Sequence, residues 1–182
     1  MRDQPQEIRT DRLLLRRWCA SDAHPFAVMN SDPKVMEFFP ALMTQSESDE
    51  SIQRFCEHFD QHGFGRWAVE VPGTAKFIGF VGLSQPAWQT SFTPCVEVSW
   101  RIASDFWGQG FAPEAATAAL EFGFQALGLD KIFSFTVPAN TRSRRVMEKI
   151  GMTHLVDQDF AHPILPPDHP LSRHVLYQIC RR

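Results

Sequence analysis

The chain has 182 residues, of which 43% are hydrophobic and 21% charged, and its formal net charge is −3. This length suits one domain with one core, so we expect a single domain over residues 1–182. The composition argues against wholesale disorder, and a weakly negative chain has no general field that attracts nucleic acid. The longest nearly unbroken apolar stretch, residues 77–83, is far shorter than the roughly 20 residues of a membrane span. We therefore expect no nucleic-acid partner and no membrane insertion.

Cysteine usage and the first residues indicate a cytoplasmic protein. The cysteines are isolated, without Cys-x-x-Cys spacing, and stand at Cys19, Cys56, Cys95 and Cys180. Such a pattern is typical of reduced thiols in a cytosolic protein. Residues 1–7 are polar and no long apolar run follows them, so we expect no signal peptide. The sequence leaves the choice between a monomer and a homodimer open.

The first third of the chain predicts one strand and two helices. Residues 9–18 contain an apolar run bounded by turn residues and predict a strand. Ser21 and Asp22 suit an N-cap before a short helix at 23–29. An irregular connector over 34–46 leads to a helix at 46–62, whose apolar residues recur at helical spacing.

The rest of the chain alternates between strands and helices. Residues 66–71 and 77–83 predict a hairpin around Pro72-Gly73, and residues 93–102 alternate as a third strand. The remaining elements are helices at 111–127 and 141–150, strands at 132–137, 153–159 and 173–180, and a Pro- and His-rich loop at 161–171. This order predicts an α+β or mixed α/β fold, in which helices cover a central sheet.

A glycine-rich loop between the strand at 93–102 and the helix at 111–127 is the segment most informative about chemistry. Gly108 and Gly110 let the backbone approach a ligand closely, and Pro113 suits the first helical position. The free N–H groups of such a loop and the helix dipole favour an anion such as a diphosphate. The Rossmann pattern would require glycine where Pro113 stands, and the Walker A pattern would require Gly-Lys-Ser/Thr. A glycine turn that merely starts a helix remains the alternative.

The wider pattern resembles the GNAT N-acetyltransferases. Residues 107–112 have the spacing of their acetyl-CoA loop, although Trp107 stands where Arg or Gln is usual. A tryptophan there resembles the RimJ/RimL-type branch, which acetylates N-terminal amines of ribosomal proteins. The opening Arg9–Arg16, the strand Glu97–Ile102, and Asn140–Ser143 followed by Glu148–Gly151 are also similar to that branch. The resemblance covers about residues 9–180.

This resemblance implies a GNAT fold with acetyl-CoA as co-substrate. The central sheet is then mostly antiparallel and splays between its fourth and fifth strands, with the pantetheine arm in the gap. Asn140 would bind the pantetheine or thioester end, and the diphosphate would meet loop N–H groups. The implied acetyl-CoA-binding residues are Trp100, Ile102, Trp107, Gly108, Gln109, Gly110, Phe111, Ala112 and Asn140.

The implied reaction is direct attack of a primary amine on the thioester in a ternary complex. Glu97 is the candidate base, because the amine must lose a proton; pairing with Arg101 or another cation is its structural alternative. Many GNATs protonate the thiolate with a tyrosine after the fifth strand, but the sole tyrosine is Tyr177, in the last strand. Ser143 would take that role, unless it is an ordinary first-turn serine.

The acceptor is an amine that the sequence does not specify, either a peptide N-terminus or a small molecule. The connector and the 161–171 loop are expected to shape its pocket. His58 and His62 are four residues apart but lack the zincin glutamate and an obvious third ligand, so we expect no metal. A non-catalytic acyl-CoA-binding or sensing module on the same fold is the alternative function, and an interaction protein with a degenerate loop is a third.

Overall fold

The computed structural model describes residues 7–181. Residues 1–6 and Arg182 lie outside this range, so the expectation of no signal peptide falls largely on residues that the structure does not describe.

The strands form one continuous sheet in the order β1-β2-β3-β4-β5-β6-β9-β7, and β8 pairs with β9. The strands are β1 (Ile8–Arg9), β2 (Leu14–Arg16), β3 (Arg66–Val71), β4 (Ala75–Ser84), β5 (Glu97–Ile102), β6 (Lys131–Thr136), β7 (Thr153–His154), β8 (Phe160–Ala161) and β9 (Arg173–Cys180). The pairing is antiparallel throughout except between β5 and β6, which are parallel. The predicted GNAT fold is therefore confirmed.

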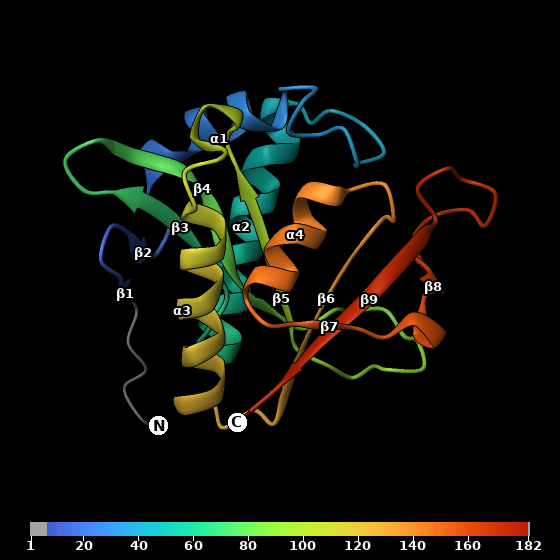
Figure 1. Cartoon of the computed structure of the whole chain (residues 1–182). Helices are drawn as coiled ribbons and strands as arrows, with labels where there is room; N and C mark the ends of the chain where they lie inside the picture. The colour runs from blue at the N-terminus through green and yellow to red at the C-terminus, as the bar shows by residue number, and fades with distance from the viewer. Residues whose placement is uncertain (1–6, 182) are drawn as a thin grey trace.

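The sheet opens between β5 and β6. These strands share a single register pair, Glu97 with Phe133, supported by the bond from Phe133 N to Val96 O at 3.0 Å. Beyond this point the strands diverge, and α4 lies in front of the gap (Figure 1). The predicted splay is thus present, and it lies between β5 and β6 because the first predicted strand forms two short ones.

Four helices cover the two faces of the sheet. They are α1 (Ala23–Asn30), α2 (Gln45–His62), α3 (Phe111–Gln125) and α4 (Thr141–Lys149), and 3-10 turns span Ala20–Asp22, Ser104–Phe106 and Val156–Gln158. In Figure 1, α3 and α4 lie in front of the sheet, and α2 lies behind it. The start of α2 is set by Thr44, which forms a capping box with Glu47.

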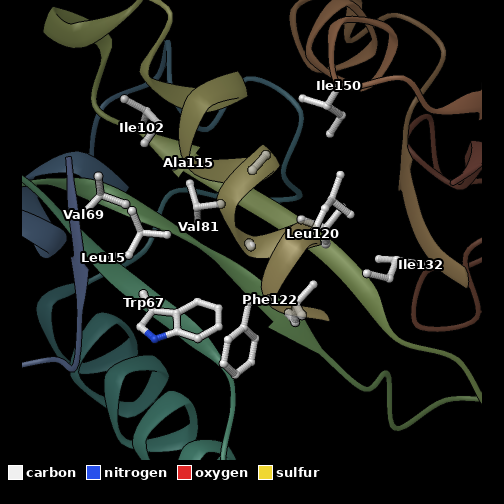
Figure 2. Packing of buried hydrophobic residues seen from close by; sticks show 14 of the residues in the cluster. Leu15, Trp67, Val69, Val81, Ile102, Ala115, Leu120, Phe122, Ile132 and Ile150 are labelled. Carbon is white, nitrogen blue, oxygen red and sulfur yellow. The ribbon is translucent and has the colours of Figure 1, made fainter. Parts of the chain in front are cut away.

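The main core lies between α3 and the strands that it crosses. Trp67 on β3 meets Phe122 on α3 edge to face, with ring centroids 5.2 Å apart (Figure 2). Gly123 lets the helix approach the sheet, because a Cβ there would lie 2.7 Å from Ile132 Cδ1. This packing anchors the helix whose first turn adjoins the glycine loop.

Three local expectations were wrong. Residues 9–18 do not form one strand, because Thr10 and Leu13 close a turn through paired bonds of 2.9 and 3.0 Å. The strand predicted at 153–159 stops at His154, because Asp159 accepts bonds from His154 Nε2 and Leu176 N that bend the segment back. Pro113 occupies the third helical position, because Gly110 is the N-cap. Proline is tolerated there as well, because it has no N–H and a first-turn N–H would have no intrahelical partner.

Candidate active site

A cavity of about 800 Å³ occupies the gap between β5 and β6. Its lining includes the connector before α2, strand β5, the glycine loop, α4 and the loop after β8, together with side chains of α2, β3, β4 and β6. It therefore joins the face covered by α3 and α4 to the face covered by α1 and α2. This arrangement lets two ligands meet in the gap, one from each face.

The glycine loop has the backbone geometry of an anion cradle. Gly108 and Gly110 have φ of +76° and +82°, a region that side chains disfavour. Trp107 anchors the loop, because its indole Nε1 donates to Ile102 O at 2.7 Å. Together these features hold the start of α3 open toward the cavity, where its N–H groups and dipole favour an anion.

Arg12 supports this loop from the N-terminal segment, and the sequence analysis missed it. Its guanidinium donates to Gln109 O at 2.9 Å and pairs with Glu114 on α3 at 2.6 Å. It also lies over the ring of Phe111, 4.8 Å from the centroid. No local motif indicates these contacts, because the partners are about a hundred residues apart in the chain.

The structure brings nearly all predicted site residues together. Those that line the cavity are Glu97, Trp100, Ile102, Trp107, Gly108, Gly110, Phe111, Ala112, Asn140 and Ser143. Gln109 is the exception, since its side chain turns back to Asp105 O at 3.2 Å. Beyond Glu97 the edge of β5 that faces the gap has no strand partner among residues 7–181, so backbone near Trp100 is free to pair with amides of a ligand. The carbonyl of Ile102 is already engaged by Trp107.

Glu97 sits at the narrow end of the gap and is held by one oxygen. Its Oε1 accepts from Arg66 Nη2 at 2.7 Å and from Ser84 Oγ at 2.8 Å. Its Oε2 has no hydrogen-bond partner in the described part of the chain. The alternative of pairing with Arg101 or another cation is therefore met by another cation, Arg66. Register explains this choice, because Arg66, Gly82 and Ser99 are aligned across three strands, and Gly82 has no side chain to obstruct Arg66.

The first turn of α4 presents Asn140 and Ser143 to the cavity. Asn140 is the N-cap: its Oδ1 accepts from Ser143 N at 3.1 Å, and its Nδ2 donates to Thr136 Oγ1 at 3.0 Å. Its amide is thus partly committed to the helix, which limits its predicted contact with a ligand. Ser143 Oγ has no partner within residues 7–181, so this hydroxyl is available. Tyr177 is 2% exposed, bonds Arg144 and Glu148, and does not line the cavity.

The charged side chains of the cavity wall are mostly basic, although the whole chain carries −3. The lining of the cavity contains one carboxylate, Glu97, and six cations: Arg54, Arg66, Arg101, Arg142, Arg145 and Lys149. Arg142 also pairs with Glu37 at 2.5 Å, which ties the connector to α4 across the opening. The sequence does not reveal this grouping, because the cations on β3, β5, α2 and α4 are far apart in the chain.

Aromatic side chains and two histidines close the end of the cavity near β9. The rings of His162 and His174 lie 4.9 Å apart and pack against Phe135 and Phe160. Burial and the neighbouring His174 lower the pKa of His162 to about 4, and burial also lowers the pKa of His174. Both rings are therefore neutral at pH 7. His58 is not a free ligand, because both ring nitrogens meet backbone groups.

The splayed sheet, the glycine loop and the two-sided cavity define an acyltransferase that takes a CoA thioester. The acetyltransferase (GNAT) domain family matches residues 12–153, and the chain belongs to this family. It is an acetyl-CoA-dependent N-acetyltransferase.

Two curated relatives are each 32% identical to the chain. The uncharacterized protein YkkB of Bacillus subtilis matches 79% of the chain and 83% of its own length. FsC-acetyl coenzyme A-N(2)-transacetylase of Aspergillus fumigatus matches 84% of the chain and 67% of its own length.

Solved structures share the fold at lower identity. A GNAT acetyltransferase of Bacillus anthracis has a TM-score of 0.78 at 24% identity, covering 96% of this chain and 98% of its own. Spermidine N-acetyltransferase of Vibrio cholerae, solved with CoA and spermine, has a TM-score of 0.70 at 21% identity, covering 94% and 96%. In the part of the chain that the structure describes, no helix is long and apolar enough to span a membrane.

Proposed function

We propose that the protein transfers the acetyl group of acetyl-CoA to a primary amine by direct attack in a ternary complex, as an enzyme of the RimJ/RimL type. The observation that carries this proposal is the cavity that passes through the gap between β5 and β6, with the glycine loop on one side and Glu97 at its narrow end. Acetyl-CoA supplies the acetyl thioester when it is bound there.

The residues of the cavity suit this co-substrate. Gly110, Phe111 and Ala112 line the cavity at the start of α3, where their N–H groups would bind the diphosphate and the positive end of the helix would add to the attraction. Arg145 and Lys149 of α4 also line the cavity, and their charges suit the phosphates of CoA. The unpaired edge of β5 near Trp100 suits the amides of pantetheine.

Glu97 and Ser143 supply the proton chemistry. Glu97 Oε2 accepts a proton from the acceptor ammonium, directly or through one water, and frees the nitrogen lone pair. The nitrogen then forms its bond to the acetyl carbon as the carbon–sulfur bond breaks, and the second proton that the nitrogen loses passes to the departing sulfur, which gives a neutral amide and the CoA thiol. The sulfur leaves with the bonding pair, and the Ser143 hydroxyl donates a hydrogen bond to it.

A thiol-release assay tests this proposal. Purified protein is incubated with acetyl-CoA and with peptides that have a free N-terminus, small amines or aminoglycosides. The acetylated product is identified by mass spectrometry. We expect thiol release in step with acetylated acceptor, and only background release when acceptor is left out. Acetyl-CoA binding by calorimetry without release on any acceptor would indicate instead an acyl-CoA-binding module.

A further inference from the structure

We propose that the acceptor is a small primary amine that also carries a carboxylate, and that Arg101 binds this carboxylate on the face covered by α1 and α2. This inference rests on the proposed acetyl transfer and specifies its substrate class. It begins from a guanidinium that the fold holds in place without an acidic partner.

Arg101 on β5 is positioned by neutral groups. Its Nη1 donates to Asn30 Oδ1 at 2.6 Å, and its guanidinium lies over the Phe39 ring, 4.1 Å from the centroid. Asn30 is itself fully buried, and its Nδ2 donates to Ser48 Oγ at 3.0 Å, which fixes the amide so that its oxygen faces Arg101. No carboxylate among residues 7–181 forms an ion pair with Arg101.

The edge of this guanidinium that has no hydrogen-bond partner among the described residues is the one that matches a carboxylate. With Nη1 held by Asn30, the Nε and Nη2 donors remain, and neither bonds another residue in the described range. Nε is buried without any partner, and a buried unpaired donor is costly. Nε and Nη2 point the same way as a fork that fits the two oxygens of one carboxylate. A carboxylate from the cavity would therefore satisfy both donors.

The neighbouring charges favour an anion in this half of the cavity. Arg66 and Arg54 line it together with Arg101, against the single carboxylate of Glu97, whose Oε1 already pairs with Arg66. Burial and the charge of Arg66 lower the pKa of Arg101 to about 10, which leaves it cationic at pH 7. A polyamine would add positive charge to this group of cations, whereas an amine with a carboxylate would neutralise part of it.

The strand spacing sets the form of the acceptor. Glu97, Ser99 and Arg101 share one face of β5, and four residues of strand separate the first Cα from the last by roughly 13 Å. The amine belongs at the Glu97 end and the carboxylate at the Arg101 end. We therefore expect a chain of several bonds between the two groups, as in an ω-amino acid.

The test compares ω-amino acids of two to six carbons with their matched carboxamides, and includes spermidine and an N-terminal peptide. We expect kcat/KM for the preferred ω-amino acid to exceed that of its amide by about 10- to 100-fold, the range for a charge-assisted contact. Most of the difference should lie in KM. In Arg101→Gln the preference for the ω-amino acid over its amide should disappear. Exposed Arg9→Gln is the control that keeps the preference.

A second variant covers the case in which Arg101→Gln fails to fold. Asn30→Asp gives Arg101 an internal carboxylate, and the Ser48 hydroxyl can donate to the new side chain. We expect this variant to lose the preference as well. The assignment of Arg101 would be overturned if kcat/KM for amides, spermidine or peptides equals that for the ω-amino acids. It would also be overturned if both variants keep the preference. Neither result would contradict the proposed acetyl transfer. If none of these acceptors supports turnover of acetyl-CoA, both this inference and the proposed acetyl transfer would be overturned.

Discussion

Replacing Glu97 with glutamine separates its proposed role as a base from its contact with Arg66. The amide oxygen of glutamine can still accept from Arg66 Nη2 and Ser84 Oγ, which now bond Oε1 at 2.7 and 2.8 Å. What disappears is the charge and the second oxygen, Oε2, which carries no bond to another described residue. The variant therefore keeps the local hydrogen bonds and removes the atom that would take the proton.

We expect Glu97→Gln to lower kcat about 10²-fold at neutral pH, the lower end for general-base catalysis, or about 2.7 kcal/mol of activation free energy. The loss should shrink as pH rises, because more of the acceptor amine is already neutral. We expect the free energy of unfolding to fall by only about 1 kcal/mol, since the Arg66 pair is partly exposed and the hydrogen bond remains.

The assay is steady-state thiol release at saturating acetyl-CoA, with a peptide N-terminal amine as the acceptor, between pH 6.5 and 9.5, values chosen to span about one and a half units on either side of an α-amine pKa near 8. Ser84→Ala is the matched control, because it removes one hydrogen bond to Oε1 and keeps the carboxylate; its kcat should fall less than about tenfold. A folded Glu97→Gln enzyme with the kcat and pH profile of the original would refute the reasoning. Glu97 would then be only the counter-ion of Arg66.

Three further changes probe the loop, the serine and the histidine pair. Gly110→Asp should weaken acetyl-CoA binding more than about tenfold in calorimetry, because it places a negative charge at the diphosphate position; Gly110→Ala, which also places a side chain on a backbone with φ +82°, should weaken it less, and equal losses would contradict an anion site. Ser143→Ala should lower kcat about 10- to 100-fold with acetyl-CoA affinity unchanged, and a fall under about twofold would exclude the serine from the reaction. The pKa of His162 lies near 4 in the folded protein and about 6.5 in an unfolded chain, so the unfolded state binds more protons between these values. Stability should therefore fall as pH drops from about 6.5 toward 4. Thermal unfolding of His162→Gln should show a weaker dependence on pH than the original or exposed His24→Gln, and an identical slope in all three would refute this.

The sequence alone determined the elements whose signals are local. Side-chain alternation placed β3, and the predicted and observed bounds of β3 and β9 are equal at 66–71 and 173–180. The helical spacing and glycine stop placed α2 within one residue, because Gly63 takes the left-handed conformation that ends the helix. The glycine loop was predicted from its own short run of residues, whereas Asn140 and Ser143 were predicted from the resemblance of residues 140–151 to the GNAT family.

The tertiary structure alone decided which side chains meet in the cavity. Glu97 pairs with Arg66 because β3, β4 and β5 bring Arg66, Gly82 and Ser99 into one row, and a shift of one residue in that register would turn Arg66 to the other face. Arg101 bonds Asn30 of α1, and Arg12, near the N-terminus, bonds the glycine loop. These contacts depend on strand register and on how helices dock, which are properties of the whole packed sheet, and no local pattern of residues encodes them.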